Sequence, residues 1–127
     1  MILIVGAVFG FISVAFGAFA EHQLRESVSE ESFRFLMTAI RYNQVYAVLI
    51  SAIGIALLSS DRLDHMPLLK SSGLIFIIGT ALFSFSIYLS VSLKIPDLVY
   101  ITPIGGVTIM AAWLLLIAAG WLEWKRQ

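Results

Sequence analysis

The side chains of this chain that could do chemistry gather near the ends of long apolar stretches. They combine an acid, a histidine, an arginine, amides, hydroxyls and a Thr-Pro-x-Gly-Gly segment. The candidate polar cluster is Glu21, His22, Arg41, Tyr42, Asn43, Gln44, Ser84, Ser86, Tyr88, Thr102, Pro103, Gly105 and Gly106. Side chains of these kinds can bind an anion, carry a proton or hydrogen-bond between helices. They do not form a nucleophile–base pair, so we assign no catalytic residue and expect no enzyme.

Arg41 is the most unusual member of the cluster. If its helix enters a bilayer near Leu36, Arg41 lies about 7 Å inside, at 1.5 Å per residue. An arginine at the bilayer centre costs about 2.5–3.5 kcal/mol on insertion scales, and less near the interface. Glu21 lies at a comparable level and is the natural ion-pair partner. Alternatively, Arg41 and the positive N-terminal end of the fourth helix hold an anionic headgroup or small anion.

Histidine and cysteine usage limits metal and cofactor chemistry. His22 could carry a proton near neutral pH, although a histidine at a helix end is also an ordinary interfacial residue. His65 lies in the connection at the other membrane face, so the two histidines cannot hold one haem between them. Cysteine is absent, which removes thiolate ligands and disulfides. We therefore expect no metal and no cofactor.

Four charge-free stretches must position these residues. Residues 1–20, 42–60, 71–93 and 98–122 contain no Asp, Glu, Lys or Arg. A hydrocarbon core of roughly 30 Å needs about 20 helical residues, and each stretch meets or nearly meets that length. Hydrophobic residues make up 60% of the chain and charged residues 13%, which is typical of a membrane protein. The net charge is zero, so a nucleic-acid partner is not expected.

The expected fold is all-α, an integral membrane bundle of four transmembrane helices in up-and-down order. One domain covers residues 1–127, with helices at about 1–20, 33–59, 71–93 and 103–124. Residues 27–30, Ser-Val-Ser-Glu, resemble a capping box and predict a helix start near Ser29. Thr102 is expected to cap the fourth helix, with Pro103 at its first position. Basic residues divide evenly between the two sides, so the orientation stays open.

Up-and-down order places the whole candidate cluster in one half of the bundle. The end of helix 1, the start of helix 2, the end of helix 3 and the start of helix 4 share one membrane face. The opposite half is mostly Leu, Ile, Val, Ala and Phe. Asn43, Gln44, Ser84 and Ser86 could hydrogen-bond between helices or line a narrow polar pocket.

The first helix carries a stripe of small residues. Its members, spaced 4, 3, 4 and 3, are Gly6, Gly10, Ser13, Gly17 and Ala20. Small residues let helices approach closely in lipid, so this is a helix-packing face, used either within the chain or between copies. Trp113, near the middle of the fourth helix, is expected to pack against it.

The same segments resemble the YgdD/YwdK-like group of small bacterial inner-membrane proteins, domain-of-unknown-function family 423, related to eukaryotic transmembrane protein 256. The matching segments, in order along almost the whole chain, are Gly17-Ala18-Phe19 with His22 and Leu24, Tyr42-Asn43 before Ala47, Phe83-Ser84 with Ser86 and Tyr88, and Ile101-Thr102-Pro103-Ile104-Gly105-Gly106. This chain departs from the family pattern at Glu21, Asn43, Tyr46 and Phe85. The resemblance implies four transmembrane helices and a bacterial inner membrane, and it implies no established activity.

The leading functional hypothesis is a non-enzymatic membrane protein that acts by binding. Its partner would be a membrane lipid or another membrane subunit, and the protein itself would be a homo-oligomer or a subunit of a complex. The alternative is a small transporter or oligomeric channel, with Arg41, Asn43, Gln44 and Ser84 lining a path. The apolar opposite half and the absence of a predicted helix break speak against that alternative.

Overall fold

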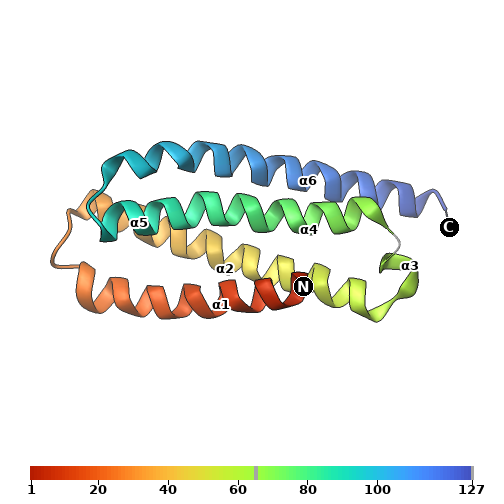
Figure 1. The fold of residues 1–127 in the computed structure, drawn as a ribbon, viewed down its shortest axis with the longest axis horizontal. Coiled ribbons are helices and arrows are strands. Elements are labelled where there is room, and N and C mark those ends of the chain that lie inside the picture. Colours follow the sequence, from red (N-terminus) through yellow and green to blue (C-terminus); the bar gives the residue numbers. More distant parts are fainter. Residues whose placement is uncertain (65, 127) are drawn as a thin grey trace.

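The computed structural model describes residues 1–64 and 66–126, which form a rod of helices lying side by side (Figure 1). Four helical segments are long and apolar enough to cross a membrane, namely Ile2–Leu24, Glu30–Ser59, Pro67–Ser92 and Pro96–Trp124. They contain 23 to 30 residues, more than the roughly 20 that a bilayer needs. The predicted all-α bundle of four long helices is confirmed.

The first two spans form an antiparallel pair. Helix α1 (Ile2–Phe19) continues into a π turn, η1 (Ala20–Leu24), and α2 covers Glu30–Ser59. The side chain of Ser29 caps α2 by accepting a hydrogen bond from the backbone N–H of Ser32. This confirms the predicted start near Ser29. The acidic side chains of Glu30 and Glu31 then lie in the first turn, where their negative charges interact favourably with the positive end of the helix dipole.

The third span begins earlier than predicted and is not a continuous α-helix. After the short α3 (Asp61–Asp64), α4 runs over Pro67–Thr80, with Pro67 in its first turn, where the missing N–H costs nothing. A π turn, η2 (Ala81–Phe85), separates α4 from α5 (Ser86–Ser92). The helix predicted at about residues 71–93 thus lies within a longer helical span, Pro67–Ser92, in which the π turn η2 accommodates one extra residue.

A left-handed residue ends α5. Lys94 has a φ of 56°, and the N–H of Ile95 bonds to the carbonyl of Ser90, as in a Schellman-type helix end. The 3₁₀ segment η3 (Pro96–Ile101) then leads into α6 (Thr102–Trp124). The predicted cap at Thr102 is wrong. Ile101 takes the cap position without a side-chain hydrogen bond, since the Thr102 hydroxyl is bonded to Ser86.

Two pairs of helices, α1 with α2 and α4 with α6, pack through close backbone contacts. A Cβ atom on Gly6 would lie 2.5 Å from Ser51 Oγ of α2. A Cβ on Gly79 of α4 would lie 2.9 Å from the backbone nitrogen of Ile109 in α6. The α2 and α4 helices join the two pairs, with the fully buried Phe76 between them. Glycines at these sites allow the helix axes to come close in lipid.

The interior divides into two clusters of buried apolar side chains along the rod. One surrounds Phe76 and includes Ile50 of α2 and Ile109 of α6. The other, toward the η1 end, includes Leu36 of α2 and Ile87 of α5. Phe83 and Phe85 of the π turn η2 border both clusters. The π turn thus lies at the boundary between the two parts of the core.

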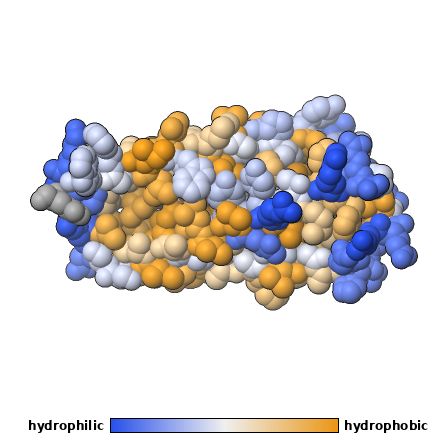
Figure 2. Space-filling view, turned by 180° about the vertical axis from the view of Figure 1, so that it is seen from behind, coloured by the Kyte–Doolittle hydropathy of each residue, from blue (hydrophilic) through white to orange (hydrophobic). Residues whose placement is uncertain are grey.

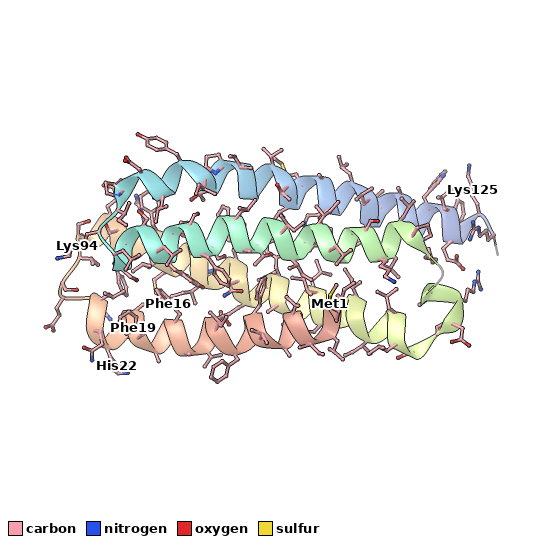
Figure 3. All side chains as sticks on the ribbon, in the orientation of Figure 1. Met1, Phe16, Phe19, His22, Lys94 and Lys125 are labelled. Atoms are coloured by element: carbon pink, nitrogen blue, oxygen red, sulfur yellow. The ribbon has the colours of Figure 1, made fainter. Side chains whose placement is uncertain are left out.

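The surface has the polarity of a membrane-spanning rod. On the face shown in Figure 2, hydrophobic side chains cover most of the middle of the rod, with a small hydrophilic patch among them, and hydrophilic side chains cover both ends. Lys94 and Lys125 lie at opposite ends (Figure 3). At the Lys125 end, Arg62 of α3 forms an ion pair with Glu123 of α6, which ties the connection between the hairpins to the last helix. In an apolar 18-residue stretch of the first and fourth spans, only 22% and 17% of the residues are buried, so most of their side chains face outward.

Candidate functional site

The structure divides the predicted polar cluster into an interior part and an outward-facing part. Asn43 lies at the centre of the interior part and is fully buried. Its amide nitrogen donates a hydrogen bond to Tyr88 Oη of α5, at 3.3 Å. The Tyr88 ring stacks on Phe16 of α1, which points into the bundle, with 3.9 Å between ring centroids (Figure 3). Three helices therefore meet at this polar contact. Within the described part of the chain, Asn43 Oδ1 has no hydrogen-bond partner.

The π turn supplies the remaining interior contacts. Ser84 Oγ donates to the carbonyl of Ala39 in α2, at 3.0 Å. Ser86 Oγ donates to the carbonyl of Phe83 at 2.9 Å and lies 2.7 Å from Thr102 Oγ1. A serine hydroxyl has one proton, so Thr102 is the donor in the second contact. These bonds connect the π turn to α2 through Ser84, and they connect Ser86, the first residue of α5, to the π turn and to the start of α6.

Glycine and aromatic members of the cluster pack around the same turn. Gly105 is buried against the backbone of Phe83, where a Cβ atom would overlap the Phe83 nitrogen. Gly106 is half-buried, and Pro103 is exposed. Tyr42 is 40% exposed and stacks on the Phe83 ring, with centroids 4.6 Å apart. The Thr102–Gly106 segment is therefore a helix start fitted onto the π turn.

Glu21, His22, Arg41 and Gln44 lie outside this interior group and are exposed. Glu21 pairs with Arg25, four residues further along the same helical segment, and the expected Glu21–Arg41 pair is not formed. Arg25 is the nearer partner in sequence, and it also lies over the ring of Phe33. His22 points away from the bundle at the outer end of the first span (Figure 3).

Arg41 faces away from the start of α6. It lies two helical turns before Val48, on the face of α2 that borders α1, whereas the start of α6 packs on η2 through Gly105. The dipole of the fourth helix therefore does not contribute to a common anion site with Arg41. Across residues 1–64 and 66–126, Arg41 forms no ion pair and no hydrogen bond through its side chain.

An open groove of about 630 Å³ runs along the outer seam between α1 and α2. The groove is concave because small side chains line it. Among its polar lining residues, Gln44 is the nearest to Arg41 along the chain. The groove is lined by Gly6, Ala7, Gly10, Ser13, Val14, Gln44, Ala47, Val48, Ser51, Ala52 and Ile55. An apolar groove on a membrane-facing surface is suited to a hydrocarbon chain.

The small residues of α1 face α2. Ser13 and Ala20 are buried, and Cβ atoms added to Gly10 and Gly17 would touch Ala47 and Ile40 of α2 at ordinary distances of 3.8 and 3.7 Å. Within the chain, this face therefore packs against α2. Its outer edge also forms one wall of the groove.

Buried polar residues that the sequence analysis missed lie in the opposite half of the bundle. Ser72 Oγ donates to the carbonyl of Ala112, and Thr80 is fully buried just before the π turn. The Trp113 indole nitrogen donates to Tyr46 Oη at 3.4 Å, and its ring packs edge-on against Phe76. The expectation that Trp113 packs against the stripe of α1 is wrong. Ser72 and Thr80 could have been found in the sequence, because each is a hydroxyl residue inside an otherwise apolar span.

The described residues contain no group of three or more His, Asp or Glu side chains that could hold a metal ion. His65 lies outside the described residues. Asn43, Ser72, Ser84 and Ser86 instead hydrogen-bond to a side chain or a backbone carbonyl of another helix, whereas the buried Thr80 Oγ1 has no partner among the described residues. In chemical terms, the interior group holds helices together, and the groove with Arg41 offers an apolar surface beside a positive charge.

Four long apolar helices, a mostly apolar middle and polar ends define a multi-pass helical protein of the membrane. The chain belongs to the family described as "Protein of unknown function (DUF423)", which matches residues 16–106. This confirms the resemblance found in the sequence. The UPF0382 inner membrane protein YgdD of Escherichia coli (strain K12) is 30% identical over 125 residues, which cover 98% of this chain and 92% of the relative.

Other relatives match over a similar length. The UPF0382 membrane protein YwdK of Bacillus subtilis (strain 168) is 26% identical over 117 residues, covering 92% of this chain and 93% of the relative. The UPF0382 membrane protein SAB0533 of Staphylococcus aureus (strain bovine RF122 / ET3-1) is 32% identical, with 94% and 93% covered. No solved structure matches the chain. The protein is thus an integral multi-pass protein of the bacterial inner membrane.

Proposed function

We propose that this protein is a non-enzymatic membrane protein that binds a membrane lipid. The observation that supports this most directly is the groove between α1 and α2, which is apolar, concave and open toward the surrounding bilayer. The glycines, alanines and serines that line it leave space that larger side chains would fill. A hydrocarbon chain lying in this space would recover the van der Waals contacts that the small residues do not make.

The buried polar contacts also favour binding over catalysis. Asn43, Ser84, Ser86 and Thr102 are engaged in contacts between helices or with the backbone of the π turn. Such contacts hold the bundle together, whereas the groove lies on the described surface and is accessible from outside. We propose no catalytic residue.

Native mass spectrometry of the protein in mild detergent tests this proposal. We expect a protein ion that carries phospholipid, and we expect Ala52→Phe, which fills the groove from its exposed edge, to reduce bound lipid severalfold. Ala111→Phe is the matched control, because Ala111 is an exposed alanine on α6, away from the groove. A wild-type protein free of lipid, or equal lipid binding by the two variants, would contradict the proposal.

Transport of a small solute or ion is a second candidate. The supporting observation is that the third span is interrupted by a π turn, a feature that is frequent at functional sites. Thr80 and Ser72 extend buried polar groups from this turn into the opposite half. Flux into liposomes that decreases in Thr80→Val, while Thr108→Val retains it, would support this function. Unchanged flux in Thr80→Val would argue against a path through the bundle.

A further inference from the structure

We infer that Arg41 binds the phosphate of the lipid whose acyl chain lies in the α1–α2 groove, so that the site prefers anionic phospholipids. This inference rests on the proposed function and adds the headgroup chemistry to it. The first observation is the position of Arg41 along the membrane normal. Its neighbour Ile40 packs against Gly17 of α1. Gly17 precedes Glu21, which is paired with Arg25, by four residues along α1. At 1.5 Å per residue, Arg41 therefore lies about 6 Å deeper in the membrane than Glu21.

The second observation is that the charge of Arg41 is not balanced locally. Its side chain is exposed, and it makes no ion pair with any residue of the described chain. Glu21, the carboxylate closest in level, is already paired with Arg25. An arginine at this depth is expensive without a partner, and a phosphate at the headgroup level can supply the missing negative charge.

The third observation is that Arg41 continues the line of the groove. On α2, Gln44, Val48, Ser51 and Ile55 follow one another along the groove at helical spacing, and Arg41 precedes Gln44 by three residues. From Gln44 to Ile55 the groove extends about 16 Å at 1.5 Å per residue. This equals roughly one half of a 30 Å hydrocarbon core, which is the space that one leaflet's acyl chains occupy.

The chemistry of the two ends of this site identifies a phospholipid as the occupant. A guanidinium group binds phosphate oxygens with two parallel hydrogen bonds, and Gln44 adds an amide donor at the start of the groove. A free phosphate would satisfy Arg41 but would leave the groove empty. A second copy of the chain would have to bring a carboxylate to the same depth, and the apolar stretches 42–60, 71–93 and 98–122 contain none.

Lipid selectivity provides the test. The purified protein is equilibrated with equal amounts of phosphatidylglycerol and phosphatidylcholine in mild detergent, and bound lipids are counted by native mass spectrometry. We expect about a fivefold preference for phosphatidylglycerol in the wild type, the size expected for one basic residue near a membrane surface. Arg41→Gln should abolish the preference while total bound lipid stays unchanged. Arg41→Lys should retain a reduced preference, because the charge remains but the planar fork is lost.

Lys94→Gln is the matched control, since Lys94 is an exposed cation at the same end of the rod but in the turn after α5. It should keep the wild-type preference. Lipid bound without preference, or a preference that survives in Arg41→Gln, would overturn the role of Arg41 and leave the groove proposal intact. A wild type without lipid would overturn both. Loss of bound phosphatidylglycerol on addition of inorganic phosphate would show a free-anion site instead.

Discussion

The amide of Asn43 in α2 donates a hydrogen bond to the phenol oxygen of Tyr88 in α5, inside a core of apolar side chains. The bond joins two spans at the end of the bundle where the first helix also packs, through the stack of Phe16 on Tyr88. In a bilayer such a bond is worth about 0.6 kcal/mol on average and at most about 1.7.

A double-mutant cycle on this pair should therefore give a small coupling energy. We expect Tyr88→Phe and Asn43→Ala to couple by about 0.6 to 1.7 kcal/mol, the range found for hydrogen bonds between membrane helices. The free energy of unfolding in mixed micelles with increasing dodecyl sulfate measures each variant. Strictly additive effects of the two substitutions would show that the bond does not contribute to stability.

Gly105 should not tolerate a side chain. A Cβ atom there would overlap the Phe83 backbone of the π turn, so Gly105→Ala must push α6 away from η2. We expect a loss of about 1–3 kcal/mol in the free energy of unfolding, as for other overpacked interiors. Gly106→Ala is the control, because its Cβ would meet only Phe83 Cδ2, at 4.0 Å. Similar stabilities of the two alanine variants would be inconsistent with this packing.

The packing of α1 on α2 predicts a graded response along the small-residue stripe. At Gly6 a Cβ would lie 2.5 Å from Ser51 Oγ and 2.7 Å from the Ser51 nitrogen, whereas at Gly17 the nearest atom would be 3.7 Å away. Gly6→Ala should therefore destabilise the protein by about 1–3 kcal/mol. Gly17→Ala should change little. Thermal unfolding in detergent, followed by circular dichroism, measures both, and the reverse order would exclude this helix arrangement.

The ion pair between Arg62 and Glu123 should respond to charge reversal. The Glu123 side chain is only 16% exposed, and its Oε2 is buried without a hydrogen-bond partner in the described residues. Arg62→Glu should lower the unfolding free energy by about 1 kcal/mol or less, the scale of a partly exposed pair. Combining it with Glu123→Arg should restore most of that loss. If the double variant is no more stable than Arg62→Glu alone, the pair does not contribute.

The sequence predicts the elements that local chemistry and hydropathy determine. Charge-free stretches locate the four spans, and the serine before two glutamates locates the start of α2. The expected ion pair between Glu21 and Arg41 is wrong, because Glu21 pairs with Arg25. Comparing the depths of charged residues along their helices cannot tell whether Glu21 pairs with Arg25, four residues away, or with Arg41 on the next helix.

The parts that could not be predicted depend on contacts between helices. The π turn leaves no composition signal, because Ala81–Phe85 consists of residues that also suit an α-helix. Thr102 has the sequence of a helix cap, but its hydroxyl bonds to Ser86, sixteen positions earlier in the chain. The groove likewise requires two helices and could not be seen in the sequence of either one.

Because of the π turn, the side chains before it and after it in the third span do not follow one continuous α-helical repeat. Before it, Phe76 and Gly79 face α2 and α6, and after it Tyr88 faces α1 and α2. Removing one residue from Ala81–Phe85 would turn every later side chain of the span by about 100°, one α-helical step. Tyr88 would then miss Asn43, and Ser86 would miss Thr102. If a relative lacks one residue in this segment and a sequence alignment omits the gap, the alignment would therefore compare residues that lie on different faces of the helix, even where their identities match.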